Sequence, residues 1–343
     1  MSSQGFCILK KPTSFDKLNR KGQNMMNVLA SIDIGTYTAR LLIAKKLPSS
    51  NILRPLARQR AYIRLADGLG LSRKKIIKAD AVDRTLNAMR DFLNCINRFR
   101  VDRICAVATG FFREAENNDQ VIKEIYKNTG IEVRIITGEE EALLSGKGAL
   151  CALDLGSTTP FLVIDLGGGS SELLIGTRDA PYAVSLPLGA AVLQHLYFKY
   201  DPPGNIQIYA LRDYIDQVLA SSSVADVAYE KRPVVIGTGG TIITIAALIH
   251  NVSLKPKLAF PERITGLEIS SSQMETLFDH MKTLTLLERI KSYGLERDRA
   301  KVILAGIFIV MRLMHFFGSA RLITSFSDLL EGLLLSADRT SVV

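Results

Sequence analysis

Short apolar runs alternate with longer stretches of helical periodicity along most of the chain. A run of about four to eight residues that is rich in apolar side chains and bounded by turn residues predicts a buried strand. Runs of this kind occupy residues 28–33, 41–44, 104–108, 131–136, 161–165, 173–175, 185–188, 234–236 and 321–324. Because helical stretches separate most of these runs, the pattern predicts an α/β fold.

The predicted helices carry their apolar side chains on one face. In residues 78–100 these side chains recur every three or four positions, from Val82 to Ile96, as a half-buried helix requires. Asn118 and Gly130 are typical of the start and the end of another helix. Further helices are predicted over 139–150, 190–198, 242–249 and most of 272–335. The most apolar run, 302–311, is too short to cross a bilayer and predicts a buried helix.

Two segments of the chain repeat one another. Residues 33–44 are DIGTYTARLLIA and residues 165–176 are DLGGGSSELLIG. Asp, Gly, Leu, Leu and Ile coincide, and Arg40 aligns with Glu172. The repeat predicts two related domains that face each other across a cleft. We expect the first domain at 28–150 and the second, with a helical C-terminal tail, at 151–343. Residues 1–27 are polar and basic and predict a flexible N-terminal extension.

Composition favours a globular protein that meets an anionic partner. The chain has 343 residues, 47% apolar and 22% charged, with a formal net charge of +9. Residues 54–103 hold thirteen Lys or Arg against five acids. That stretch predicts either a solvated helical face or a surface for phosphate groups. Nucleic acid is the less favoured partner, because neither a known motif nor interleaved aromatic residues accompany the charge.

Cysteine usage and the N-terminus indicate a cytoplasmic protein. The four cysteines are Cys7, Cys95, Cys105 and Cys151, and none of them has CxxC spacing. Neither a zinc site nor a disulfide framework is therefore expected, and free thiols are typical of a reducing compartment. A secretory signal is not predicted, because the N-terminus has no long apolar segment.

Each repeated segment joins two strands through a glycine turn that follows an aspartate. Glycine leaves the backbone N–H groups accessible to phosphate oxygens, and the carboxylate can hold a hydrated Mg²⁺. A third glycine-rich segment, 236–242, lies between a strand and a helix and predicts either an anion site or close strand–helix packing. Residues 153–157 (LDLGS) imitate such a loop, but no long apolar run precedes them, so we expect a linker there.

A set of ordered motifs resembles the exopolyphosphatase and guanosine pentaphosphate phosphohydrolase (Ppx/GppA) family. The motifs are DIGTYTARLLIA, AVATGFFREAEN, IITGEEEALL, VIDLGGGSSELLIG, SLPLGA, GTGGT and LERDRAKVILAG. The resemblance covers about residues 28–335. It implies the actin-like, sugar-kinase and heat-shock ATPase superfold, in which two duplicated ribonuclease H-like domains hold a phosphate site in the central cleft.

The resemblance also implies roles for individual residues. Glu141 matches the glutamate that activates water, and Asp165 and Glu172 match acids that bind a divalent metal, Mg²⁺ or Mn²⁺. The residues that match phosphate-binding positions are Asp33, Gly35, Thr36, Arg113, Gly167, Gly168, Ser170, Gly239, Gly240 and Thr241. The chain departs from the family pattern at Tyr37, where Asn is usual, at 110–112, and at Leu143, where Arg commonly follows Glu-Ala.

The implied activity is metal-dependent hydrolysis of terminal phosphoanhydride bonds of inorganic polyphosphate, with release of orthophosphate. One alternative is a guanosine pentaphosphate phosphohydrolase of the stringent response, and another is a catalytically weak sensor of guanosine tetraphosphate. A kinase of the same superfold is less favoured, because the family match argues against transfer to a second substrate. We expect no membrane partner, and a homodimer is compatible with the sequence.

Overall fold

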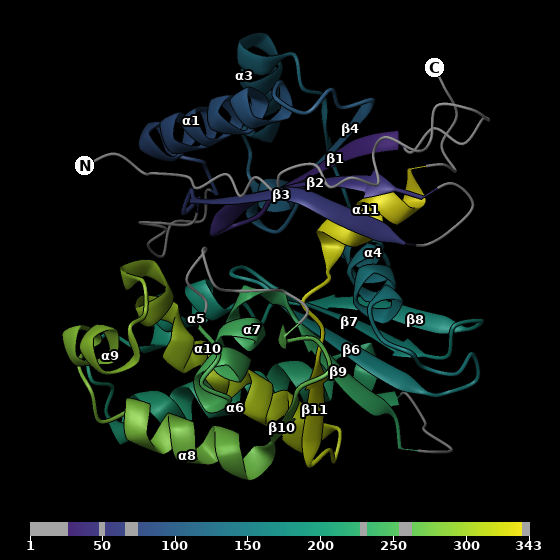
Figure 1. Ribbon diagram of the computed structural model, residues 1–343. Coiled ribbons are helices and arrows are strands. Elements are labelled where there is room, and N and C mark those ends of the chain that lie inside the picture. Colours follow the sequence, from purple (N-terminus) through teal and green to yellow (C-terminus); the bar gives the residue numbers. More distant parts are fainter. Residues whose placement is uncertain (1–26, 48–51, 66–74, 227–231, 254–262, 338–343) are drawn as a thin grey trace.

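The computed structural model describes residues 27–47, 52–65, 75–226, 232–253 and 263–337. Two mixed sheets form the two halves of the molecule (Figure 1). The predicted α/β class is therefore confirmed. The predicted extension before Asn27 lies outside the described residues.

The first sheet has the strand order β3-β2-β1-β4-β5. Its strands are β1 (Asn27–Ile34), β2 (Thr38–Lys46), β3 (Leu53–Tyr62), β4 (Arg103–Ala108) and β5 (Val133–Ile135). The helices α1 (Ala79–Ile96) and α3 (Asn118–Thr129) lie on the outer side of this sheet (Figure 1). Buried side chains of the sheet, such as Ile32 and Leu41, form one core with Phe92 of α1 and Ile125 of α3.

The second sheet has the order β10-β11-β9-β6-β7-β8. Its strands are β6 (Phe161–Leu166), β7 (Ser171–Gly176), β8 (Pro181–Leu186), β9 (Val234–Thr238), β10 (Glu268–Ser270) and β11 (Arg321–Thr324). A large core joins it to α5 (Ala190–Tyr197), α6 (Asn205–Ser221), α7 (Gly239–Ile249), α8 (Ser271–Met281), α9 (Leu286–Tyr293) and α10 (Arg297–Phe316). These helices occupy the lower part of Figure 1.

The two sheets share one connectivity. In the first, β1 pairs antiparallel with β2 and parallel with β4. In the second, β6 pairs antiparallel with β7 and parallel with β9. The hairpin turns match as well, since Gly35 N–H donates to Thr38 O and Gly167 N–H to Ser170 O, both at 3.0 Å. The repeat in the sequence is therefore a repeat of structure.

Two helices connect the halves. The helix α4 (Gly138–Cys151) follows the first sheet in sequence but packs against β6, β7 and β8. The helix α11 (Leu329–Ser336) follows the second sheet, but its Leu330 and Leu334 pack on Leu29 and Leu42 of the first. The domain boundary near residue 150 stays a proposal. Because α11 packs on the first sheet, this helix is better grouped with the N-terminal half.

Among the described residues, the sequence did not predict β3, β10, α6, the short helix α2 (Phe111–Glu114) or the 3-10 helix η2 (Ser223–Asp226). β3 is an edge strand rich in arginine, so its sequence lacks the apolar alternation that marks a half-buried strand. The segment predicted as a third glycine loop is not a loop. Gly237 and Thr238 end β9, and Gly239 is the first residue of α7.

The apolar run 302–311 lies inside α10, where it is buried against the second sheet. This confirms the predicted buried helix. Within the residues that the structure describes, no helix combines the length and apolar character needed to cross a membrane.

Candidate active site

Asp33 and Asp165 occupy equivalent places near the ends of β1 and β6. Asp33 is the cross-strand partner of Arg40, and Asp165 is the cross-strand partner of Glu172. All three acids are buried. The first hairpin thus presents an opposite-charge pair, whereas the second presents two carboxylates.

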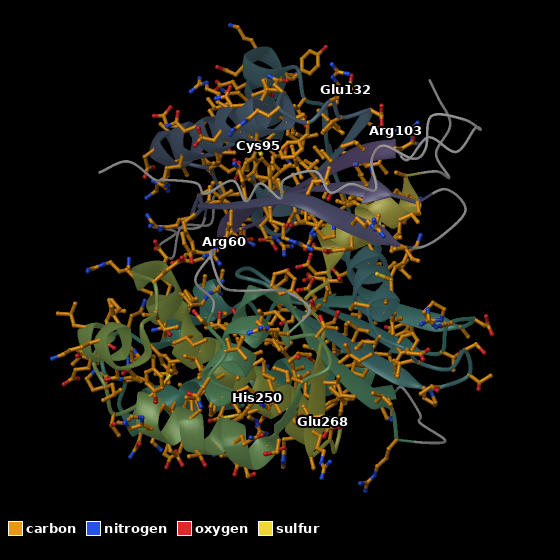
Figure 2. All side chains as sticks on the ribbon, in the orientation of Figure 1. Arg60, Cys95, Arg103, Glu132, His250 and Glu268 are labelled. Carbon is orange, nitrogen blue, oxygen red and sulfur yellow. The ribbon has the colours of Figure 1, made fainter. Side chains whose placement is uncertain are left out.

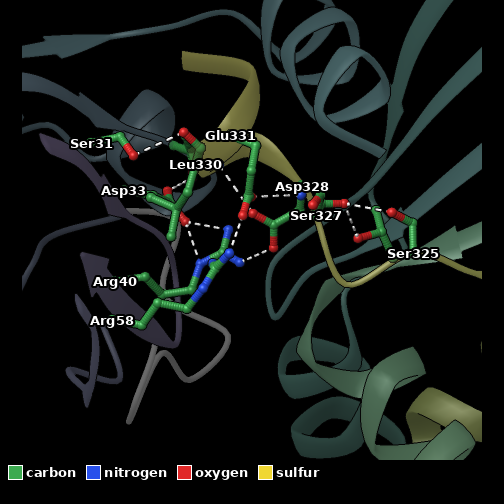
Figure 3. A network of polar contacts seen from close by, with 11 residues as sticks. Ser31, Asp33, Arg40, Arg58, Ser325, Ser327, Asp328, Leu330 and Glu331 are labelled. Carbon is green, nitrogen blue, oxygen red and sulfur yellow. Dashed lines mark hydrogen bonds and ion pairs between the residues drawn. The ribbon is translucent and has the colours of Figure 1, made fainter. Parts of the chain in front are cut away.

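Arg40 pairs with Asp33 of its own hairpin and with Asp328 of the C-terminal segment (Figure 3). Its Nε and Nη2 donate to Asp33 Oδ2 at 3.0 and 2.8 Å, and its Nη1 donates to Asp328 Oδ2. The other oxygen of Asp33 accepts from the Thr109 hydroxyl at 3.2 Å. Asp328 is the N-cap of α11, where it accepts from Leu330 N–H. Asp33, which was predicted to bind phosphate, is therefore occupied in orienting Arg40.

A second cluster gathers around Arg113 of α2. Its Nη1 donates to Glu141 Oε2, and its Nη2 lies 3.7 Å from Glu172 Oε1. Glu172 Oε1 also accepts from the hydroxyls of Ser170 and Ser185 at 2.6 and 2.8 Å. Thr137 caps α4 by accepting from Glu140 N–H, and Glu141 follows in the first turn. The structure therefore brings together Arg113, Glu141, Ser170 and Glu172, all predicted site residues.

Burial shifts the acids of this cluster toward their neutral forms. Burial raises the pKa of Glu141 to about 7, opposed by Arg113. Burial and the nearby Asp328 raise the pKa of Asp165 to about 6, opposed by Arg40. The pKa of Glu172 is raised well above its ordinary value by burial and by the charges of Glu141 and Asp165. An additional positive charge would stabilise the ionised cluster.

The donor set fits a hard divalent cation. Five buried acids lie near two arginines. Arg40 pairs with Asp33 and Asp328 and lowers the pKa of Asp165, and Arg113 contacts Glu141 and Glu172. Among the described residues no three His, Cys, Asp or Glu side chains form a ready-made metal cage. Mg²⁺ is commonly held by one or two carboxylates, with water and substrate phosphates completing its shell. Asp165 and Glu172 meet that requirement.

The first two glycine turns contact each other directly. A Cβ on Gly168 would lie 2.6 Å from Tyr37 Cβ, and a Cβ on Gly169 would lie 2.2 Å from Thr36 Oγ1. The Thr36 hydroxyl also accepts from Phe111 N–H at 2.9 Å. Only glycine permits this approach, so the turns 35–37 and 167–170 form one continuous surface.

The start of α7 adjoins the surface formed by these two turns. A Cβ on Gly239, whose φ is +86°, would lie 2.6 Å from Asp165 Oδ1. A Cβ on Gly240 would lie 2.6 Å from Arg299 Nη2, and Arg299 Nη1 donates to Thr241 Oγ1 at 3.2 Å. Arg299 is buried, and burial lowers its pKa. Free N–H groups at a helix start and a buried arginine both favour an anion.

Sequence reasoning missed Arg40, Asp328 and Arg299 as members of the site. In the sequence Arg40 stands out only by its alignment with Glu172, and the resemblance implies no role for Arg299 within the motif LERDRAKVILAG. Asp328 gave no signal, because its place depends on α11 returning to the first sheet. Leu143 points outward with 43% of its surface exposed, which separates this departure from the buried cluster.

The basic stretch is used largely for contacts inside the molecule. Arg58 pairs with Glu331, Arg60 with Glu296 and Arg64 with Asp298. Figure 2 shows Arg60 on the side of the first sheet that faces the second half. Glu296 and Asp298 lie at the start of α10, so the pairs of Arg60 and Arg64 join the two halves. Glu331 lies on α11, so the pair of Arg58 holds α11 on the first sheet. Neither a solvated helical face nor a phosphate surface describes these three arginines.

Comparison with known proteins finds similarity to one family of phosphatases along most of the chain. The Ppx/GppA phosphatase family model matches residues 42–340. "Exopolyphosphatase 1" of Mycobacterium tuberculosis is 28% identical over 321 residues, which cover 92% of this chain and 91% of that protein. A crystal structure of the Aquifex aeolicus member of the Ppx/GppA family has 29% identity and a TM-score of 0.75, covering 92% of this chain and 100% of that one.

A further structure bears on the fold alone. An exopolyphosphatase from Cytophaga hutchinsonii has a TM-score of 0.80 at 24% identity, covering 91% of this chain and 97% of that one. With the shared strand order of the two sheets, these likenesses confirm the expected fold of two duplicated actin-like, ribonuclease H-like units.

Proposed function

The chain belongs to the Ppx/GppA phosphatase family, and on that basis we propose that it removes terminal phosphates from inorganic polyphosphate in a metal-dependent reaction. The family makes it a phosphatase. The choice of polyphosphate is supported by relatives named exopolyphosphatase. The observation that carries the chemistry is the contact of Arg113 with both Glu141 and Glu172 beside the glycine turns.

Glu141 is the proposed general base. With a pKa of about 7, a large fraction of its carboxylate is ionised at neutral pH and can accept a proton from water. The water oxygen forms a bond to the terminal phosphorus, and the bond from that phosphorus to the bridging oxygen breaks. The products are orthophosphate and a chain shortened by one phosphate.

The surrounding groups would hold the substrate. Bound to Asp165 and Glu172, a divalent metal would neutralise charge on the phosphates. Arg113 and Arg299 supply guanidinium groups that match phosphate oxygens. Backbone N–H groups of 35–37, 167–170 and 239–241 provide further donors. In this proposal the contact with substrate releases Glu141 from its ion pair with Arg113.

Guanosine pentaphosphate is the alternative substrate, and guanosine tetraphosphate without turnover is the alternative ligand. Both carry the phosphates that this site is proposed to bind, so assays must separate them. A cytoplasmic location and a homodimer are further hypotheses, the first supported by cysteines that form no disulfide among the described residues, Cys95, Cys105 and Cys151.

The test is phosphate release with Mg²⁺ from long polyphosphate, guanosine pentaphosphate and ATP in parallel, with Glu141→Gln as the inactive control. We expect release mainly from polyphosphate in the wild type and very little in the variant. Release from guanosine pentaphosphate alone would assign the alternative activity. Tight binding of guanosine tetraphosphate without turnover of any substrate would assign the sensor.

A further inference from the structure

The first turn of α10 contacts two of the proposed phosphate-binding segments through consecutive residues. The Tyr37 hydroxyl donates to Asp298 Oδ1 at 3.1 Å and lies 3.2 Å from Asp298 O. The next residue, Arg299, donates to Thr241 at the start of α7. One helix end in the second half is thus bonded both to the first hairpin turn and to the third segment.

Tyr37 is held on its other sides by the first and second turns. Its carbonyl accepts from Ile63 N–H at 3.0 Å and from Arg64 N–H at 3.1 Å. Its Cβ is the atom that a side chain on Gly168 would meet at 2.6 Å. Tyr37 therefore lies between the second turn, the end of the first sheet and α10.

Asp298 also pairs with Arg64, whose backbone N–H bonds to Tyr37, so Tyr37, Arg64 and Asp298 contact one another. Arg64 Nε and Nη2 donate to its two carboxylate oxygens at 2.7 and 2.5 Å. Burial would raise the pKa of Asp298, but Arg64 and Tyr37 hold it below its ordinary value. The acid is ionised at neutral pH, and a hydrogen bond to an ionised acceptor is stronger than a neutral one.

We propose that Tyr37 is a positioning residue whose bond to Asp298 sets the spacing between the first and second glycine turns and so the affinity for the phosphate chain. This rests on the proposed function, because it assigns those turns to phosphate binding. The contacts of Tyr37 described above are with Asp298, Gly168 and residues 63–64, and none of these is a group proposed to react; those groups are Glu141, Asp165 and Glu172. Its effect is therefore on binding and not on the chemical step.

Tyr62 supplies a matched control. Its hydroxyl donates to Glu296 Oε2 at 2.7 Å, again between the first sheet and the N-terminal end of α10. Its ring packs edge-on against Tyr37 with centroids 5.6 Å apart. Tyr62 belongs to β3 and contacts the first turn only through this ring contact and its pairing with Thr38, both of which phenylalanine keeps. Phenylalanine at either position removes one hydroxyl and keeps the ring.

The experiment compares Tyr37→Phe, Tyr62→Phe, Asp298→Ala and the double variant Tyr37→Phe/Asp298→Ala. Steady-state phosphate release from polyphosphate gives KM and kcat. Hydrogen–deuterium exchange reports on the amides of 63–65, which bond to the carbonyls of Thr36 and Tyr37. We expect Tyr37→Phe to raise KM about 10-fold, the scale of one hydrogen bond to a charged group, with kcat little changed. Exchange of 63–65 should accelerate, and Tyr62→Phe should do neither.

The double variant should be no worse than Asp298→Ala, because both changes remove the same bond. Equal KM and equal exchange in the two phenylalanine variants would overturn the proposal, as would a fall in kcat at constant KM in Tyr37→Phe. If the wild type releases no phosphate from polyphosphate, the proposed function fails. Faster exchange of 63–65 in Tyr37→Phe alone would still support the positioning contact, and unchanged exchange would overturn it.

Discussion

Asp165 and Glu172 lie directly opposite one another on β6 and β7, at the positions that Asp33 and Arg40 occupy on β1 and β2. Like charges on facing positions of a sheet are destabilising, and burial adds to that cost. Of the two copies of the hairpin, the first therefore carries an acid paired with an arginine and the second carries two acids. The acidic turn is where the proposed cation would bind, and the pseudo-symmetric fold would then carry an asymmetric site.

The first prediction concerns that cation. Mg²⁺ should raise the melting temperature of the wild type, because a ligand that binds only the folded state stabilises it. The shift should shrink in Asp165→Asn and Glu172→Gln, which lose a charged oxygen ligand, but persist in Asp80→Asn, a surface acid paired with Arg84. Differential scanning fluorimetry with and without Mg²⁺ measures this. Full phosphate release after exhaustive EDTA treatment would contradict metal dependence.

The second prediction concerns Glu141. Glu141→Gln keeps the size of the side chain but cannot accept a proton, so turnover should fall by about 10²–10⁴-fold. Equilibrium binding of a short polyphosphate should survive, because the metal ligands and glycine turns remain. Glu140→Gln is the matched control, since Glu140 pairs with Arg134 on the surface. Unchanged turnover in Glu141→Gln would move the role elsewhere, and joint loss of binding would make Glu141 a ligand or structural anchor.

The third prediction is a pH profile set by Arg113. Without metal Glu141 is ionised above a pKa of about 7, and a bound cation would lower that pKa. At saturating Mg²⁺ kcat/KM should therefore rise with pH and level off at or below that value. Arg113 opposes the upward shift of this pKa, and its removal in Arg113→Ala should move the rise to higher pH. Arg113→Lys keeps a charge and should move it less. A profile that stays at the wild-type position in Arg113→Ala would show that Glu141 does not limit kcat/KM.

The sequence was sufficient to predict the duplicated hairpins, because their strands are apolar runs and their turns carry aspartate and glycine. It was also sufficient to predict that Glu141 and Glu172 share a site, through the family resemblance. Three arginines in and just after β3 show where sequence reasoning stops. Arg58, Arg60 and Arg64 form a basic pattern in the chain, but each meets an acid more than two hundred residues away. Such partners are brought together by tertiary packing, either of the two halves or of α11 on the first sheet, and leave no local pattern in the sequence.

The same limit applies to the crossing of α4 and α11, which carries the fourth prediction. A Cβ on Gly148 would lie 1.8 Å from Asp328 O, and a Cβ on Gly332 would lie 1.9 Å from Leu144 O. Both obstacles are backbone atoms, so a side chain can be admitted only if the helices separate. In the sequence these glycines are merely poor helix formers.

Gly332→Ala should therefore destabilise the protein by about 1–3 kcal/mol through overpacking, even though alanine favours a helix by about 1 kcal/mol over glycine. Gly204→Ala is the control, because a Cβ there would meet no atom within 4 Å. Its free energy of unfolding should fall by less than about 1 kcal/mol, as expected at an N-cap. Urea denaturation of both variants measures the difference. Because α4 carries Glu141 and the N-cap of α11 is Asp328, separation of the helices should also lower turnover in Gly332→Ala. Equal stability in the two variants would show that α4 and α11 can separate without cost, and the close crossing would then not be what holds Glu141 and Asp328 at the site.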